Sequence, residues 1–199
     1  MTKKIDTFSA HSLKILNKSL QEFEDKFIYG LSLFKKDNRA ILGQNFHNLI
    51  CAFFKNFDTA KIQMELNEKE LSIWNNLKNS LEDKKDKFIK TEYSFLIKCE
   101  LEKDFYYLTG RFDAIYKDEN EYIIYDWKTL NLPKTPEEDL QSIVYLYCAS
   151  KIFNTKNIKV RYLSIEKLNF IDVFFKEEKI YKEKIDNIIL KYYKKETLY

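Results

Sequence analysis

The sequence predicts an α/β domain in which a mixed β-sheet core is flanked by α-helices. Three observations support this fold class: helical patterns at both ends of the chain, a run of strand-like segments in the middle, and one helix between those strands and a final hairpin. Only three Gly and two Pro residues interrupt the segments. With 199 residues, the chain is expected to form a single domain over 1–199.

Three helices are predicted before the first strand. In each of them, apolar residues recur at three- and four-residue steps, which is the spacing of one helix face. The helices cover about 10–28, with Ser9 or Ser12 near the start, then about 41–55 and about 67–82. Their apolar stripes are expected to face the core.

From Phe88 onward the apolar period changes to that of strands. Segments 91–99, 105–117 and 121–129 are rich in Tyr, Phe, Ile and Thr and are separated by polar turns. Residues 122–125 are apolar at every position, which a strand tolerates when the sheet is covered on both faces. We therefore expect this strand to be central.

The second half of the chain returns to a helical pattern after a loop at 131–138 that holds both prolines, Pro133 and Pro136. The remaining expected elements are a helix, the two strands of a hairpin and a last helix, over about 139–153, 158–165, 168–175 and 177–194. The resulting order, α-α-α-β-β-β-α-β-β-α, is typical of a mixed sheet with flanking helices.

Composition excludes several classes of protein. A net charge of +3 excludes a polybasic nucleic-acid-coating protein, and 16% aromatic residues exclude intrinsic disorder. The three cysteines, Cys51, Cys99 and Cys148, are far apart and form no CxxC pair. No segment approaches the ~20 apolar residues of a membrane span, and the start lacks the apolar run of a signal peptide. A cytoplasmic protein without a membrane partner is expected.

Two carboxylates interrupt the predicted central hairpin of the sequence GRFDAIYKDENEYIIYDWKT. If the turn has two residues, Glu119 and Asn120, antiparallel pairing places Asp113 directly opposite Asp126, with Cβ atoms about 5 Å apart. Two carboxylates that close repel each other unless a cation lies between them or one is protonated. The pair therefore suggests a site for an oxygen-ligated ion such as Mg²⁺ or Mn²⁺.

Lys128 adds a third charged group to this point of the sheet. It follows Asp126 by two residues, so both side chains lie on one face of the strand, whereas Trp127 points to the other face. The same three charged residues are also consistent with a simple salt-bridged sheet edge.

His47 is a further candidate, because it borders the apolar stripe of the helix GQNFHNLICAFF and lies four residues after Gly43. A histidine in this position is, by itself, more often a surface or core residue than a ligand.

Taken in order, these residues resemble a known family. The motifs are Gly43-x-x-x-His47, Glu92 at the start of a strand, Gly110-Arg111-Phe112-Asp113, Asp126-Trp127-Lys128-Thr129, and Gln141-x-x-x-Tyr145 on the following helix. Their order over about 9–147 resembles the RecB-like branch of the PD-(D/E)XK nuclease superfamily. The resemblance implies a restriction-endonuclease-like sheet core.

The resemblance also implies an activity, the hydrolysis of DNA phosphodiester bonds with Mg²⁺ or Mn²⁺. In such enzymes the equivalents of His47, Asp113, Asp126 and the main-chain carbonyl of Trp127 hold the metal. The equivalent of Lys128 accompanies the attacking water, which it would position or deprotonate while offsetting charge on the phosphorane.

Gln141 and Tyr145 lie one turn apart on one helix face. The resemblance implies that they touch the scissile nucleotide or order the Asp–Lys strand. A purely structural alternative places Tyr145 in the core and lets Gln141 cap a strand carbonyl.

Two other residues have implied roles near the metal. Glu92 is expected to bind a metal-bound water or a second ion. Arg111 is expected to contact a phosphate, or else to pair with Asp113, which lies on its own side of the strand.

The sequence departs from the family pattern in places. Some members of the branch carry an iron–sulfur cluster, but 16–30 and 176–199 contain no cysteine, so no cluster is expected. Phe112 stands where the superfamily name has proline. A GxxxxGK[ST] motif is absent, so the chain has no ATP-driven motor of its own, and a separate helicase is a candidate protein partner.

Three hypotheses for function follow. The first is a metal-dependent deoxyribonuclease of DNA repair, recombination, mobile-element or defence processes. The second is a catalytically silent nucleic-acid-binding subunit with the same fold, although the complete set of motif residues argues against a decayed site. The third, a non-nuclease protein with a chance hairpin, would be favoured if Asp113 and Asp126 lay on opposite faces of the sheet.

Overall fold

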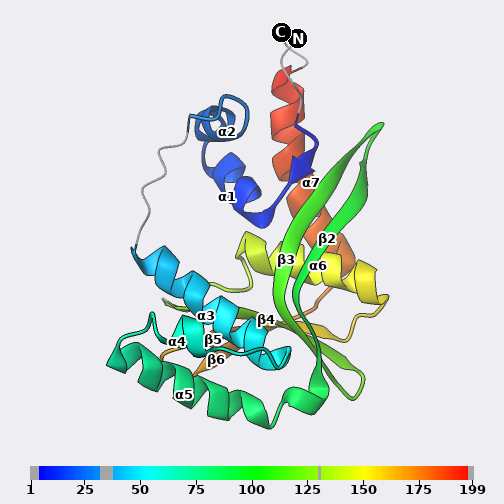
Figure 1. Ribbon diagram of the computed structural model, residues 1–199. Coiled ribbons are helices and arrows are strands. Elements are labelled where there is room, and N and C mark those ends of the chain that lie inside the picture. Colours follow the sequence, from blue (N-terminus) through cyan, green and yellow to red (C-terminus); the bar gives the residue numbers. More distant parts are fainter. Residues whose placement is uncertain (1–4, 32–37, 130, 197–199) are drawn as a thin grey trace.

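A mixed β-sheet with helices on both faces forms the molecule in the computed structural model, which describes residues 5–31, 38–129 and 131–196 (Figure 1). Its strands are β1 Thr7–Phe8, β2 Phe88–Leu101, β3 Asp104–Asp118, β4 Glu121–Lys128, β5 Ile158–Ser164 and β6 Phe170–Phe174. The helices are α1 Ala10–Lys18, α2 Leu20–Phe27, α3 Asn38–Phe54, α4 Ala60–Gln63, α5 Glu68–Glu82, α6 Leu140–Phe153 and α7 Glu178–Glu196, with a 3₁₀ turn at Lys85–Lys87. The predicted fold class is confirmed.

The long strand β3 organises the sheet. Strand β2 pairs antiparallel with one edge of β3 over nearly its whole length. Two strands share the other edge of β3. Strand β1 pairs with it in parallel at Tyr107 and Leu108, and strand β4 pairs with it antiparallel from Ala114 to Asp118. Strand β4 then pairs in parallel with β5, and β5 pairs antiparallel with β6. Strand β4 is thus internal, as the sequence predicts.

Two hydrophobic clusters cover the two faces of the sheet. One contains side chains of α1, α2, α6 and α7 together with Ile124 and Val160 of the sheet. The other contains side chains of α3 and α5 together with Ile123 and Tyr125. Neighbouring residues of β4 are therefore buried in opposite clusters, which explains why 122–125 is apolar at every position.

The helix expected at 10–28 is wrong as one element, because the structure divides it at Ser19. This residue has an extended backbone, with φ −156° and ψ 118°, and its hydroxyl accepts a hydrogen bond from the Glu22 amide. Ser19 is therefore both the C-cap of α1 and the N-cap of α2. Serine favours caps because its side chain competes for main-chain hydrogen bonds, and the uninterrupted apolar period concealed the break.

The turn that sets the register of the central hairpin has the two predicted residues. Asp118 pairs with Glu121, so Glu119 and Asn120 form the connection, and Glu119 has a positive φ of 52°. The sequence did not predict the short strand β1 or helix α4, because their two and four residues are too few to show a periodic pattern.

Candidate metal centre and active site

Three carboxylates lie at one level of the sheet, on three neighbouring strands. The β3–β4 register pairs Ala114 with Tyr125, so the next position places Asp113 opposite Asp126. The β2–β3 register places Glu92 opposite Asp113, because the residues on either side of Glu92 pair with those on either side of Asp113. The sheet therefore aligns Glu92, Asp113 and Asp126 across β2, β3 and β4.

His47 of helix α3 meets this row. Its Nδ1 lies 3.5 Å from Asp113 Oδ1. Donor atoms of His47, Glu92 and Asp113 all lie within 4.8 Å of one another, a group that the described residues bring together from a helix and two strands.

Glu92 reaches this group through an unusual backbone. Its φ of +53° is in the left-handed region although it lies inside β2. A non-glycine residue in that region costs of order 1–3 kcal/mol and persists where the surroundings impose it. Arg111 Nη1 lies 2.5 Å from Glu92 Oε2, so the alternative pairing of Arg111 with Asp113 is replaced by a pair with Glu92.

The second acid, Asp126, is buried and has partners on both oxygens. Its Oδ1 accepts a hydrogen bond of 2.7 Å from Gln141 Nε2, and its Oδ2 lies 2.6 Å from Lys128 Nζ. Lys128 Nζ also donates to Gln141 Oε1 at 3.1 Å. Asp126, Lys128 and Gln141 thus form a closed triangle between β4 and α6.

The main chain of Trp127 faces the carboxylates. Its N–H donates to Asp113 Oδ2 at 2.9 Å. The carbonyl of Lys128 instead accepts from Ile165 on the side of β5. Because successive residues of a strand direct their N–H and C=O groups to opposite sides, the Trp127 carbonyl also faces β3. The Trp127 ring packs in the cluster with α3 and α5.

Gln141 and Tyr145 occupy the first turns of α6 and hold the site from behind. Asp139 caps this helix by accepting from the Gln141 amide at 2.7 Å. The Tyr145 hydroxyl donates to the Arg111 carbonyl at 2.7 Å, and only 7% of Tyr145 is exposed. The structure thus places Tyr145 in the core and Gln141 on the Asp126–Lys128 pair.

The electrostatics of the site are those of excess negative charge. Burial, and then the charge of Asp113, raise the pKa of Asp126 to about 6, although Lys128 and His47 oppose the shift. Burial lowers the pKa of His47, but its hydrogen bond and charge interaction with Asp113, followed by Asp126 and Glu92, outweigh burial and raise it. Both groups gain protons more readily than usual, which is expected where a cation is needed.

The residues present fit a divalent cation. Imidazole nitrogen and carboxylate oxygens are common ligands of such ions. Asp126 Oδ2 is buried, and its one recorded contact is the ion pair with Lys128 Nζ. A buried carboxylate oxygen with spare accepting capacity beside His47, Glu92 and Asp113 is suited to an ion.

Gly43 brings α3 close to the end of β4. A Cβ atom added to Gly43 would lie 3.4 Å from the Thr129 side chain. The glycine of the Gly43-x-x-x-His47 motif therefore allows the helix to approach Thr129, one turn before it presents His47.

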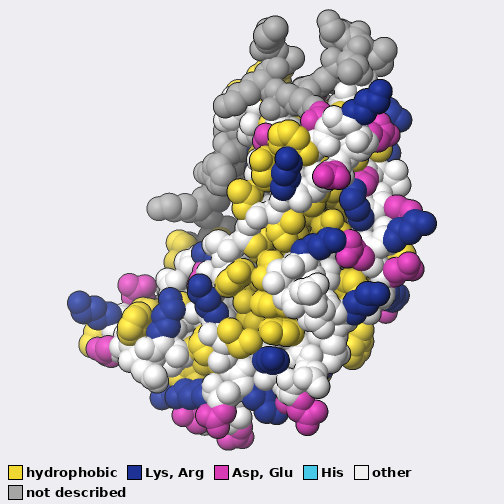
Figure 2. Space-filling model, turned by 90° about the vertical axis from the view of Figure 1, so that its right-hand side faces the viewer, with side chains coloured by type: hydrophobic (Ala, Val, Ile, Leu, Met, Phe, Trp, Pro, Cys, Tyr) yellow, Lys and Arg dark blue, Asp and Glu magenta, His cyan; other side chains and the backbone are white. Residues whose placement is uncertain are grey.

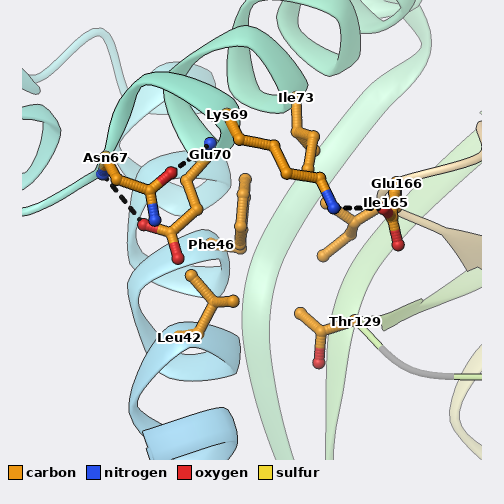
Figure 3. Close-up of a pocket in the computed structure, with 9 residues that line it drawn as sticks. All are labelled: Leu42, Phe46, Asn67, Lys69, Glu70, Ile73, Thr129, Ile165 and Glu166. Carbon is orange, nitrogen blue, oxygen red and sulfur yellow. Dashed lines mark hydrogen bonds and ion pairs between the residues drawn. The ribbon is translucent and has the colours of Figure 1, made fainter.

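The adjoining face of α3 anchors the helix. Figure 3 shows Leu42 and Phe46 projecting from α3 into an apolar pocket that Ile73 of α5 also lines. Its polar rim is internally paired, because Asn67 and Glu70 form the capping box of α5 and Lys69 lies 3.1 Å from Glu166. This packing fixes the rotation of α3 and so the direction of His47.

Two supporting residues were missed from the sequence. Asp139 was assigned to the helix that it caps, although an acid directly before an apolar periodic run is a known start signal. Tyr162, whose ring centroid lies 5.3 Å from Lys128 Nζ, had no signal because the β4–β5 pairing was not predicted.

In the described part of the chain, no helix is long and apolar enough to cross a membrane.

Comparison with solved structures supports the fold. The crystal structure of SSO0001 superposes with a TM-score of 0.52 at 16% identity, covering 96% of this chain and 78% of that one. A structure described as "Putative exonuclease" from Eubacterium rectale superposes with a TM-score of 0.56 at 8% identity, covering 94% and 79%. At such identities the similarity shows the fold alone.

Sequence comparison gives the family. No curated protein matches the chain significantly. The family model of the PD-(D/E)XK nuclease superfamily matches residues 7–196, which includes all the strands and the complete candidate site. With the sheet, the row of acids and the Asp-x-Lys strand in place, the chain belongs to the PD-(D/E)XK nuclease superfamily.

Proposed function

We propose that the protein is a metal-dependent deoxyribonuclease that hydrolyses phosphodiester bonds. The observation that carries this proposal is the convergence of His47, Glu92 and Asp113 donor atoms within 4.8 Å, beside the Asp126–Lys128 pair. A salt-bridged edge would not need a histidine and three aligned carboxylates at one level of the sheet.

His47, Asp113, Asp126 and the Trp127 carbonyl would hold Mg²⁺ or Mn²⁺, with Glu92 as a further carboxylate for a bound water or a second ion. Such an ion supplies Lewis-acid stabilisation of the charge on phosphate oxygens. The Trp127 amide keeps Asp113 oriented through its 2.9 Å hydrogen bond.

Lys128 is proposed to act on the attacking water. Its ammonium is fixed by Asp126 and Gln141, so it can donate a hydrogen bond in a defined direction and orient the water toward phosphorus. It also offsets the negative charge that develops on the phosphoryl oxygens. Arg111, whose side chain is 49% exposed beside Glu92, is proposed to contact a neighbouring phosphate.

We place the chain in the RecB-like branch of the superfamily, on the order of its motifs. DNA repair, recombination, mobile-element and defence processes are the proposed settings, and a helicase is the proposed kind of protein partner. The cofactor set contains no iron–sulfur cluster, because the cysteine positions that the cluster requires are not cysteines in this sequence.

The test is incubation of the purified protein with end-labelled single- and double-stranded DNA in Mg²⁺, Mn²⁺ or EDTA, followed by gel analysis. We expect cleavage with metal and none with EDTA. Lys128→Ala should reduce cleavage at least about 100-fold, the lower range for a positioned acid–base group. DNA binding should remain within about threefold, because one cation among many contributes little to affinity.

A matched control is Lys87→Ala, which removes another lysine that is paired with an aspartate, Asp118 at 2.7 Å, far along the hairpin from the site. It should cleave at the wild-type rate. Binding of DNA without metal-dependent cleavage by the wild type would instead support the catalytically silent subunit, and wild-type cleavage by Lys128→Ala would refute the role of the lysine.

A further inference from the structure

The β2–β3 hairpin continues past the site, and its two faces differ. Tyr106 and Leu108 point into the cluster with α1, α6 and α7 and are fully buried. The alternate positions of both strands point away from that cluster. On this outer face Leu96 is 63% exposed and Phe105 is 37% exposed.

The outer face combines aromatic rings with cations. The register pairs Lys98 with Tyr107, so both side chains share the face. The rings of Phe105 and Tyr107 lie edge to face at 5.6 Å, and Lys98 Nζ lies 4.4 Å from the Phe105 ring centroid. Glu100 lies opposite Phe105 and places an acid on this face as well.

The same face of β3 leads to the candidate active site. With a period of two, Phe105 and Tyr107 are followed by Thr109 and Arg111, in steps of about 7 Å. Arg111 is paired with Glu92 of the carboxylate row. The aromatic pair and the carboxylates are therefore connected by one continuous line of side chains.

A polar pocket lies beside this line. Thr109, Ser9, His11, Lys14 and Gln141 contribute to its lining, and its volume is about 250 Å³. Its lining includes Gln141, the residue that contacts both Asp126 and Lys128.

Two lysines lie around the pocket, and one of them is already paired with an acid. Lys26 Nζ lies 2.8 Å from His11 Nε2, and Lys14 pairs with Asp139 at 2.7 Å. Burial, then Lys26 and Lys14, lower the pKa of His11. Lys26 thus offers a positive charge beside His11 that a phosphate can meet.

Figure 2 looks at the molecule from the side on which the β2–β3 hairpin lies in Figure 1. It shows a stripe of hydrophobic side chains running along the molecule, with Lys and Arg side chains beside it and Asp and Glu side chains among them. A hydrophobic stripe with cations along it is typical of surfaces that stack bases and neutralise phosphates.

We propose that Leu96, Lys98, Phe105, Tyr107 and Arg111, here called the hairpin platform, bind single-stranded nucleic acid and direct it through the polar pocket to Lys128. The inference rests on the proposed function and names the form of its substrate. Bases stack on Phe105 and Tyr107, while Lys98 and Arg111 contact phosphates. A single strand is favoured over a duplex, because the base faces of a duplex are already stacked and cannot reach the two rings.

The experiment measures binding apart from cleavage. The full chain carrying Lys128→Ala is titrated in EDTA against a fluorescent oligo-dT and a duplex of the same length. Phe105→Ala and Tyr107→Ala should each raise the Kd for oligo-dT by about tenfold, which is the effect of losing one stacked base. Tyr107→Phe keeps the ring and should bind almost as well as the parent.

Phe174→Ala is the matched control. Phe174 is a 57% exposed phenylalanine on β6 with Lys159 Nζ at 5.5 Å from its ring, but it lies outside the platform. Its replacement should leave the Kd unchanged.

Two results would overturn the platform. In the first, Phe105→Ala and Tyr107→Ala reduce the affinity for oligo-dT no more than Phe174→Ala does. In the second, the duplex binds as tightly as oligo-dT, and the two substitutions reduce its affinity by as much. The first is also expected if the face docks a protein or a second copy of the chain. Failure of the wild type to cleave DNA would refute the proposed activity and leave the binding result standing.

Discussion

Burial, a neighbouring carboxylate and an ammonium all act on Asp126. Only 4% of the residue is exposed, and Asp113 lies opposite on the adjacent strand. Lys128 compensates part of the charge, but the pKa near 6 shows that the ionised form remains less favourable than in water. The site therefore stores unfavourable energy that a bound cation would relieve.

Asp126→Asn should stabilise the metal-free protein at pH 8. The ordinary pKa near 3.8 is raised to about 6 on folding, so the wild type loses stability as pH rises from about 4 through 6. The neutral amide avoids this loss, and Tm should rise by about 2–4 °C for each kcal/mol recovered. The measurement is thermal unfolding in EDTA at pH 8 and at pH 4, where the advantage should disappear. An unchanged or lower Tm at pH 8 would contradict it.

Gln141 and Tyr145 position their neighbours, so changing them should separate cleavage from metal binding. Gln141→Ala combined with Tyr145→Phe removes the clamp on Asp126 and Lys128 and the bond to the Arg111 carbonyl. We expect cleavage to fall by about 10- to 100-fold, the cost of a misplaced reacting group, with Mn²⁺ affinity within about threefold.

Calorimetric titration with Mn²⁺ and a cleavage assay on the same preparation test the double variant. Unchanged cleavage would show that both residues have only a structural role. Loss of Mn²⁺ binding would show that they support the ligands themselves.

At the scale of elements, the site is a junction of one helix and three strands. Strands β2, β3 and β4 provide the carboxylates, whereas α3 provides His47 across the gap bridged by Gly43 and Thr129. The spacing between α3 and β4 is thus a property on which metal affinity should depend.

Gly43→Leu should weaken metal binding, and Gly43→Ala should not. An alanine Cβ would meet Thr129 at 3.4 Å, an ordinary contact, and alanine favours the helix by about 1 kcal/mol. A leucine side chain extends beyond this Cβ atom toward Thr129, so we expect it to displace α3 and move His47 away from Asp113. Mn²⁺ titrations of the two variants check this, with circular dichroism to confirm that both fold. Equal affinities would refute the dependence on helix spacing.

For the whole molecule, metal binding should be coupled to stability. The proposed ligands belong to distant parts of the chain that only the native fold brings together, so an ion should bind the folded state and not the unfolded one. At 100 times its Kd, Mn²⁺ should add about 2.7 kcal/mol to the free energy of unfolding. Differential scanning fluorimetry with and without Mn²⁺ should show a higher Tm in the wild type. The gain should be lost in Asp113→Ala, and an equal gain in that variant would locate the ion elsewhere.

The sequence by itself determined the fold class and most elements, because long periodic segments with few Gly and Pro residues leave little choice of secondary structure. It also determined the Asp113–Asp126 register, since a two-residue turn between two clear strands fixes every pair beyond it. The alternation that separates Trp127 from Asp126 and Lys128 is equally local, because it follows from the pleat of one strand.

Only the tertiary structure decided the remaining features of the site. It placed Glu92 beside Asp113 and paired Arg111 with Glu92. It also joined Gln141 to Asp126 and Lys128 through hydrogen bonds. The break at Ser19 was decided by a side-chain cap that the apolar period does not encode. These contacts join residues from different elements, and their geometry depends on how helices and strands pack in three dimensions. Local propensity contains no information about such packing, which is why the sequence determined the hairpin but not its surroundings.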